Sequence, residues 1–202
     1  MKGVQANREY FVCMIPLGVL SKIFVDEPSD TLPEFRAQRK LNEKRIPEIE
    51  RYILDNRNSY VFSALTASVD GQIFFSPMGK SGDIGELEID ISATFLINDG
   101  QHRKAAILEA IESDESLKEE TISVVLYRDQ GLANSQQMFT DLNKHAINAS
   151  KSLNTLYDSK DPMAVMTKHV VSQVPFLRKY TDKEKDNLAQ YAAKLFTLNV
   201  LY

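Results

Sequence analysis

Apolar residues recur along this 202-residue chain with two periods, one typical of strands and the other of helices. Runs that are rich in β-branched and aromatic residues, or that alternate between apolar and charged positions, indicate strands. These runs are residues 10–15, 61–69, 87–91 and 122–127. The dipeptide Asp70-Gly71 is typical of a hairpin turn, so we expect the strand before it to pair with residues 73–75.

Apolar positions spaced three and four residues apart indicate helices. They occur in residues 47–54, 101–112, 135–145 and 188–199. Asp161 followed by Pro162 predicts a further helix start, with the carboxylate as cap and proline in the first turn. Residues 181–184 have the capping-box form, with Thr181 as cap and Glu184 reaching back, and should begin the last helix.

These elements predict the α+β class. We expect a small mixed sheet with flanking helices over residues 1–148, followed by a helical extension over residues 149–202. The last helical pattern reaches Tyr202 without a Gly or Pro stop signal. The extension is therefore expected to be truncated at its C-terminal end.

The most informative stretch of the sequence runs from residue 95 to residue 107. An apolar run at residues 95–97 meets the turn residues Asn98-Asp99-Gly100, and helical spacing begins at Gln101. Asp99 or Asn98 is a candidate cap for the first helical turn. Gly100 allows a positive φ and a close approach to the backbone.

The first turn of this helix carries three basic residues, His102, Arg103 and Lys104. Cations oppose the positive end of a helix dipole, whereas an anion bound at the free N–H groups would relieve that conflict. One interpretation is therefore a phosphate-facing site over residues 99–104. The other is an ordinary solvated helix start in which Arg103 pairs with a carboxylate, and the spacing alone leaves both open.

Two other regions offer polar candidates. Residues 36–45 hold five basic residues, which suit contact with nucleotide or DNA phosphate but also suit a solvated face balanced by nearby acids. Asn143 lies near the end of the helix predicted over residues 135–145. It is a candidate to hold a phosphate or a metal-bound water, and equally a helix C-cap.

Composition restricts the partners and the compartment. Hydrophobic residues make up 43% and charged residues 26% of the chain, as in soluble globular proteins. With a net charge of −4, any contact with DNA requires a local basic patch. The single cysteine, Cys13, excludes an internal disulfide and fits the reducing cytoplasm. No apolar run reaches the ~20 residues that span a bilayer, and no Cys/His cluster indicates a metal site.

Residues 99–103 spell DGQHR, the signature of the DGQHR-domain proteins, and the chain resembles the DndB family within that group. This family comprises accessory proteins of DNA phosphorothioation, that is, DNA sulfur modification. The order of parts, with Gly100 and Arg103, is more distantly similar to the ParB/sulfiredoxin superfamily. Four further segments carry the family resemblance: Gln38–Asn42, Tyr60–Ala67, Ser135–Asn143 and Lys151–Asn154.

The resemblance implies a DNA-binding regulator of the modification genes or machinery. DNA, other phosphorothioation proteins and a second copy of the chain are the expected partners. The alternative is a ParB-like module that binds or hydrolyses an NTP with Mg²⁺. In that case Asp99 and His102 are the candidate catalytic residues, and the candidate phosphate ligands are Gly100, Gln101, Arg103, Arg39, Asn143 and Lys151. A third hypothesis is an interaction module that binds a partner through its helical extension.

Overall fold

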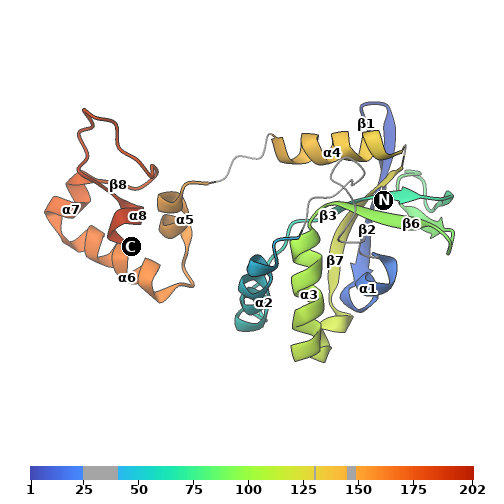
Figure 1. Cartoon of the computed structure of the whole chain (residues 1–202), viewed down its shortest axis with the longest axis horizontal. Coiled ribbons are helices and arrows are strands. Elements are labelled where there is room, and N and C mark those ends of the chain that lie inside the picture. Colours follow the sequence, from blue (N-terminus) through green and yellow to red (C-terminus); the bar gives the residue numbers. More distant parts are fainter. Residues whose placement is uncertain (25–40, 130, 145–148) are drawn as a thin grey trace. The chain divides into compact units, whose positions relative to one another are not determined.

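The computed structural model describes residues 1–24, 41–129, 131–144 and 149–202. The chain falls into two compact units, residues 1–145 and residues 146–202 (Figure 1). The first unit combines a sheet with flanking helices, which confirms the predicted α+β class. None of the described helices is both long enough and apolar enough to cross a membrane.

Five of the described strands in the first unit form one mixed sheet. Its order is β1-β2-β7-β3-β6, and only β3 and β7 run parallel. The strands predicted at residues 10–15, 61–69 and 122–127 are confirmed in type, with shifted ends. The strands of this sheet are β1 (Lys2–Gln5), β2 (Arg8–Pro16), β3 (Leu65–Asp70), β6 (Thr94–Asp99) and β7 (Thr121–Arg128).

The expected hairpin at Asp70-Gly71 is wrong. Strand β4 (Ile73–Pro77) pairs with β5 (Gly85–Ile89), and β3 pairs with β6 instead. The hydrophobic pattern explains this choice, because antiparallel pairing places Ile73 opposite Ile89 and Phe75 opposite Leu87. Apolar side chains then share one face of the β4–β5 ribbon, which sets its register.

The hydrophobic core lies between one face of the sheet and helices α2 (Ile46–Asp55) and α3 (Gln101–Ser113). The short helical segments η1 (Leu17–Val19), α1 (Leu20–Ile23) and η4 (Glu115–Glu119) add Leu17, Leu20 and Leu117 to this core. The segment η3 (Glu43–Arg45) precedes α2 and has no buried residue. Pro47 lies in the first turn of α2, as predicted. The largest fully buried side chains include Phe11, Leu65, Ile107 and Leu126.

The other face of the sheet is polar where helix α4 (Leu132–Lys144) packs against β6 (Figure 1). Strand β3 is buried on both faces: Ala67 and Val69 enter the apolar core, and Ser68 points the opposite way. Ser68 is only 1% exposed. The sheet therefore has one apolar face and one face with buried polar groups.

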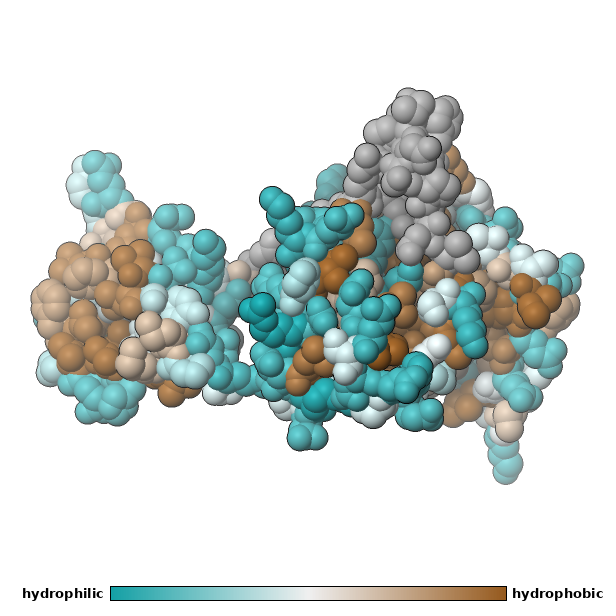
Figure 2. All heavy atoms as spheres, turned by 60° about the horizontal axis from the view of Figure 1, so that its bottom comes forward, coloured by the Kyte–Doolittle hydropathy of each residue, from teal (hydrophilic) through white to brown (hydrophobic). Residues whose placement is uncertain are grey.

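Over residues 149–202, which the structure describes, the second unit has four helices and one strand pair. They are α5 (Lys151–Tyr157), α6 (Pro162–Gln173), α7 (Pro175–Tyr180), β8 (Thr181–Asp182), β9 (Phe196–Thr197) and α8 (Leu198–Leu201). Asp161 caps α6 through the N–H of Met163, which confirms that helix start. Apolar side chains gather on the face of this unit seen in Figure 2, and its exposed apolar residues include Met166, Val170 and Phe176.

The helix predicted from the capping box at Thr181 is wrong. Thr181 belongs to β8, which pairs in parallel with β9. The carboxylate of Asp182 accepts the N–H groups of Glu184 and Lys185, both at 2.9 Å. Asp182 thus accepts the N–H group of Glu184 that Thr181 would have accepted as cap. The chain between β8 and β9 is neither helix nor strand.

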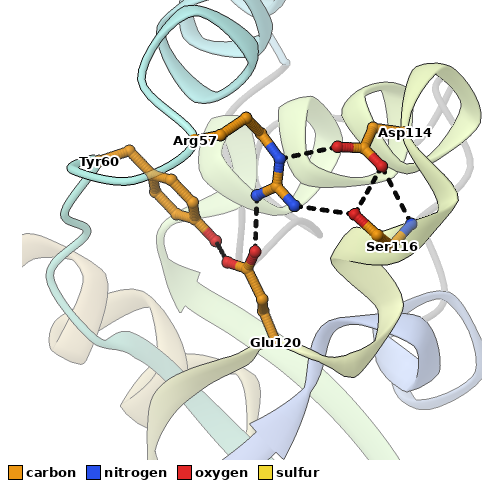
Figure 3. A network of polar contacts seen from close by, with 5 residues as sticks. All are labelled: Arg57, Tyr60, Asp114, Ser116 and Glu120. Atoms are coloured by element: carbon orange, nitrogen blue, oxygen red, sulfur yellow. Dashed lines mark hydrogen bonds and ion pairs between the residues drawn. The ribbon is translucent and has the colours of Figure 1, made fainter.

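A polar network fixes the chain between α2 and β3 (Figure 3). Arg57 donates to Asp114 at 2.7 Å, to Glu120 at 2.6 Å and to Ser116 at 3.0 Å. The hydroxyl of Tyr60 donates to the second oxygen of Glu120. All five residues are joined, so the segment that leads into β3 is tied to η4 and to the start of β7.

This network predicts a pH dependence at Tyr60. Burial and the hydrogen bond to Glu120 raise the pKa of the Tyr60 hydroxyl from 10.0 to about 12. In the unfolded chain Tyr60 loses its proton at a lower pH than in the folded chain. The contribution of Tyr60 to the free energy of unfolding is therefore complete below pH 10 and is lost as the pH rises to about 12. In ultraviolet titration of tyrosinate, we expect Tyr60→Phe to remove the last-titrating tyrosine.

Tyr157→Phe is the matched control, because this tyrosine is 74% exposed and belongs to the second unit. It should leave the last titration step in place. A Tyr60→Phe protein that keeps the same last step would contradict the assignment.

Candidate functional site

The turn at residues 99–103, here called the DGQHR turn, joins β6 directly to α3. Strand β6 ends at Asp99, and α3 begins at Gln101. The predicted strand–turn–helix order is therefore confirmed. The predicted side-chain cap is wrong, because no side chain caps α3. Asp99 pairs with Arg103 instead, and Asn98 accepts a hydrogen bond from Ser68 at 2.8 Å.

Gly100 is required at this turn for two independent reasons. Its backbone is left-handed, with φ 102° and ψ 15°, a conformation that side chains with a Cβ disfavour. A Cβ at this position would also lie 2.4 Å from Cδ2 of Leu65 and 3.2 Å from the guanidinium carbon of Arg103. The turn thus packs its bare backbone against the first residue of β3.

Arg103 is turned back toward the protein and clamps the turn to the chain before β3. One guanidinium nitrogen donates to the carbonyl of Ser63 at 2.6 Å, to its hydroxyl at 2.5 Å and to the carbonyl of Ala64 at 2.8 Å. The other donates to Asp99 at 2.5 Å. The side chain is 16% exposed. The carboxylate pairing considered as the alternative for Arg103 is therefore present, and its phosphate-binding role stays a prediction.

The other two basic residues of the first turn also face the protein. Nε2 of His102 accepts the backbone N–H of Asn42 at 2.9 Å, so this nitrogen carries no proton in that contact. Lys104 is 4% exposed. The side chain of Lys104 therefore lies inside the protein, and the phosphate-facing interpretation of this turn stays a prediction.

Two amides beside the turn lack hydrogen-bond partners among the described residues. They are Nδ2 of Asn98 and Nε2 of Gln101, and both atoms are buried. A buried polar group without a partner costs about 1–3 kcal/mol. The unsatisfied donors at this site are thus side-chain amides, whereas the guanidinium of Arg103 has four acceptor contacts.

The remaining candidate residues are Arg39, Asn143 and Lys151. Arg39 lies outside the described residues. Asn143 is exposed and donates to the carbonyl of Phe139 at 2.7 Å within its own helix. Lys151 belongs to the second unit, where its N–H donates to Asp186 at 2.9 Å. Their binding roles remain predictions.

Asp99 has one of its carboxylate oxygens in the ion pair with Arg103, and its side chain is 42% exposed. Across the described ranges, no group of three or more His, Cys, Asp or Glu residues is arranged to hold a metal ion. The catalytic roles of Asp99 and His102, and the Mg²⁺ that would accompany an NTP, therefore remain predictions.

Two of the segments that carry the resemblance contact the DGQHR turn. Asn42 contacts His102, and Ser63 and Ala64 accept from Arg103. A family model described as DndB, DNA-sulfur modification-associated, matches residues 1–202. The chain belongs to the DndB family. Neither the curated proteins nor the solved structures gave a match, so the ParB-like fold also remains a prediction.

Membership of the DndB family links the chain to DNA sulfur modification. The family signature has a clear structural use in this chain, because Gly100 makes the turn and Arg103 clamps it. Sequence reasoning missed the acceptors Ser63 and Ala64, since backbone carbonyls leave no mark in a side-chain pattern. The resemblance of Tyr60–Ala67 to the family was the available signal for them.

The left-handed turn predicts a large cost for a side chain at residue 100. Gly100→Ala should lower the free energy of unfolding by about 2 kcal/mol or more, because it adds a collision with Leu65 to the left-handed strain. Denaturant unfolding measures the loss. Gly79→Ala is the matched control. Gly79 also has a left-handed backbone, with φ 78°, but nothing lies within 4 Å of an added Cβ. We therefore expect Gly79→Ala to lower the free energy of unfolding by only about 1 kcal/mol.

The clamp predicts that Arg103 stabilises the first unit. Arg103→Ala should lower the free energy of unfolding by about 2–3 kcal/mol, because charge-assisted hydrogen bonds to three residues are lost. Arg103→Lys should restore only part of this lost stability, because an ammonium lacks the forked donor geometry of a guanidinium. Arg51→Ala, an exposed arginine on α2, should change stability by at most about 0.5 kcal/mol. Equal losses for Arg51 and Arg103 would contradict the clamp.

Proposed function

We propose that this chain is a DNA-binding accessory protein that regulates the genes or the machinery of DNA phosphorothioation. Membership of the DndB family supports the link to DNA sulfur modification. The distribution of charge between the two units supports the contact with DNA and carries the proposal.

The two units have opposite charge. Residues 146–202 contain eight Lys and Arg against five Asp and Glu, a net charge of +3. Residues 1–145 contain sixteen Lys and Arg against twenty-three Asp and Glu, a net charge of −7. Because affinity for DNA depends strongly on basic groups that neutralise phosphates, the second unit is the better DNA-contacting surface.

Three cations lie together at the end of α7. Arg178 and Lys179 are exposed in its last turn. The ammonium of Lys194 donates to the carbonyl of Lys179 at 2.7 Å, which places a third positive charge beside them. A cluster of this kind suits contact with a run of phosphates, which requires no base-specific group. We call Arg178, Lys179 and Lys194 the α7 cluster.

The nucleotide alternative has less support from the geometry. Phosphate binding by Arg103 would compete with Asp99 and with the carbonyls of Ser63 and Ala64. The clamp instead suits a structural role for the signature. We therefore place the DNA contact at the α7 cluster and regard the DGQHR turn as the feature that holds the first unit together.

The experiment measures duplex binding by the full chain across a series of salt concentrations. Replacing the three residues of the α7 cluster by Ala should weaken binding, because each phosphate contact contributes about 0.9 to the slope of log affinity against log salt. We expect the slope to fall by about 2–3 if all three cations contact phosphate. The promoter region of the modification genes and a random duplex should both be used.

The control removes the same charge from the first unit. Lys44, Arg51 and Lys144 are exposed there, and their replacement by Ala should leave the salt slope nearly unchanged. A larger loss in this control than in the α7 variant would place the DNA contact in the first unit. No binding of the unaltered chain to either duplex would reject the proposal.

A further inference from the structure

Three aromatic side chains of the second unit pack together next to the α7 cluster, and we call Phe176, Tyr180 and Phe196 the aromatic cluster. Phe176 and Tyr180 lie four residues apart on α7, so their rings share one face of the helix, with centroids 5.0 Å apart. The ring of Phe196, on β9, packs edge-on against Phe176 at 6.2 Å. Phe176 is nevertheless 52% exposed. The second unit thus presents to solvent an aromatic ring that two neighbouring rings hold in place.

The cations of the α7 cluster lie on the same two segments as these rings. The ammonium of Lys179 is 5.0 Å from the ring centroid of Tyr180. Lys194, two residues before Phe196, donates to the carbonyl of Lys179 at 2.7 Å, and the N–H of Leu195 donates to the carbonyl of Tyr180 at 2.8 Å. These contacts hold the chain that leads into β9 alongside the end of α7. Aromatic rings and positive charges therefore share one surface.

One acidic residue, Asp182, balances part of this positive charge. Backbone hydrogen bonds lower the pKa of the Asp182 carboxyl, and the ammonium of Lys194 adds to this effect. The carboxylate is therefore ionised at neutral pH and lies close enough to Lys194 to offset some of its charge. Among the described residues, neither Arg178 nor Lys179 forms an ion pair. Both cations remain available to an anion.

A surface that combines these features matches an unpaired DNA strand better than a duplex. A duplex offers its phosphates but keeps the faces of its bases stacked inside, so it would contact the cations and leave Phe176 unused. A single strand offers phosphates and base faces together, and bases stack on aromatic side chains in proteins that bind single strands. Stacking uses the face of a base, so it requires no hydrogen-bond donor or acceptor from the protein.

A membrane surface is the other partner that combines anionic and apolar groups. Peripheral proteins usually reach it through a long amphipathic helix, in many cases of about 20–30 residues. Helix α7 has only six residues. The family of this chain is associated with DNA sulfur modification. DNA is therefore the favoured partner for this surface.

We propose that the α7 cluster and the aromatic cluster together bind single-stranded DNA, with Phe176 stacking on a base and the three cations contacting phosphates. Tyr180 and Phe196 are positioning residues that hold the ring of Phe176. This inference rests on the proposed contact between the α7 cluster and DNA, and it adds the form of DNA that the surface prefers.

The first experiment compares two single strands in binding to the unaltered full chain. One is an intact strand of about ten nucleotides, and the other has the same backbone with an abasic site in place of every base. Both offer the same phosphates, but only the intact strand offers a base for stacking. We expect the abasic strand to bind more weakly by about fivefold or more, and a duplex of the same length also to bind more weakly than the intact strand. Equal affinity for the intact and abasic strands would overturn the proposal.

Phe176→Leu tests the ring itself. Leucine keeps an apolar side chain for Tyr180 and Phe196 to pack against, but it has no flat face. The variant should bind the intact strand more weakly by about fivefold or more. The slope of log affinity against log salt should not change, because stacking releases no counterions. Phe176→Tyr keeps the ring and should retain the affinity.

Tyr157→Leu is the matched control. Tyr157 is 74% exposed and belongs to the same unit, but it lies outside the aromatic cluster. This variant should bind the intact strand as the unaltered chain does, and a loss as large as that of Phe176→Leu would contradict the assignment. If Phe176→Leu fails to fold, the comparison of intact and abasic strands still decides.

The same measurements separate this inference from the proposed function. If duplex binding depends on the α7 cluster but the intact and abasic strands bind equally, the proposed function stands and this inference fails. If neither duplex nor single strand binds, both fail. Vesicles of phosphatidylglycerol provide the lipid comparison. Vesicle binding that depends on Phe176, together with equal binding of the two single strands, would overturn the inference in favour of a membrane surface.

Discussion

The fan of hydrogen bonds from Arg103 is the interaction on which the first unit most depends. It joins the turn between β6 and α3 to the chain that enters β3, which lies about 40 residues earlier in the sequence. Its geometry requires Gly100, because any side chain there would occupy the space of Leu65. The polar network around Arg57 and Glu120 fixes the other end of the same entering chain (Figure 3).

This arrangement favours a structural role for the DGQHR signature over the anion-binding role that its sequence suggests. A basic helix start next to a glycine turn resembles an anion site when only the sequence is known. In the structure, the protein's own carbonyls and a carboxylate satisfy the guanidinium of Arg103, and Lys104 is buried. Among the described residues at this turn, the buried donors without a partner are the uncharged amides of Asn98 and Gln101.

The sequence predicted what depends on local pattern. The α+β class, the strand–turn–helix at the signature, and the starts of α2 and α6 all follow from apolar periods and terminal residues. The pairing of β4 with β5 did not, because turn dipeptides say where a chain reverses but not which strands become neighbours. The failure at Thr181 has a similar cause: the next residue, Asp182, competed for the same backbone groups. The carbonyl groups that accept from Arg103 could not be predicted, since backbone carbonyls leave no mark in the pattern of side chains.

The position of β7 also has a consequence for synthesis on the ribosome. This strand lies between β2 and β3, yet it follows both of them, and α3, in the chain. Until residues 121–128 emerge, the β1–β2 hairpin has no sheet to join, and β3 has only β6 beside it. Two exposed strand edges therefore persist through most of the translation of the first unit, and such edges favour aggregation. The nascent chain is most vulnerable just before its central strand arrives.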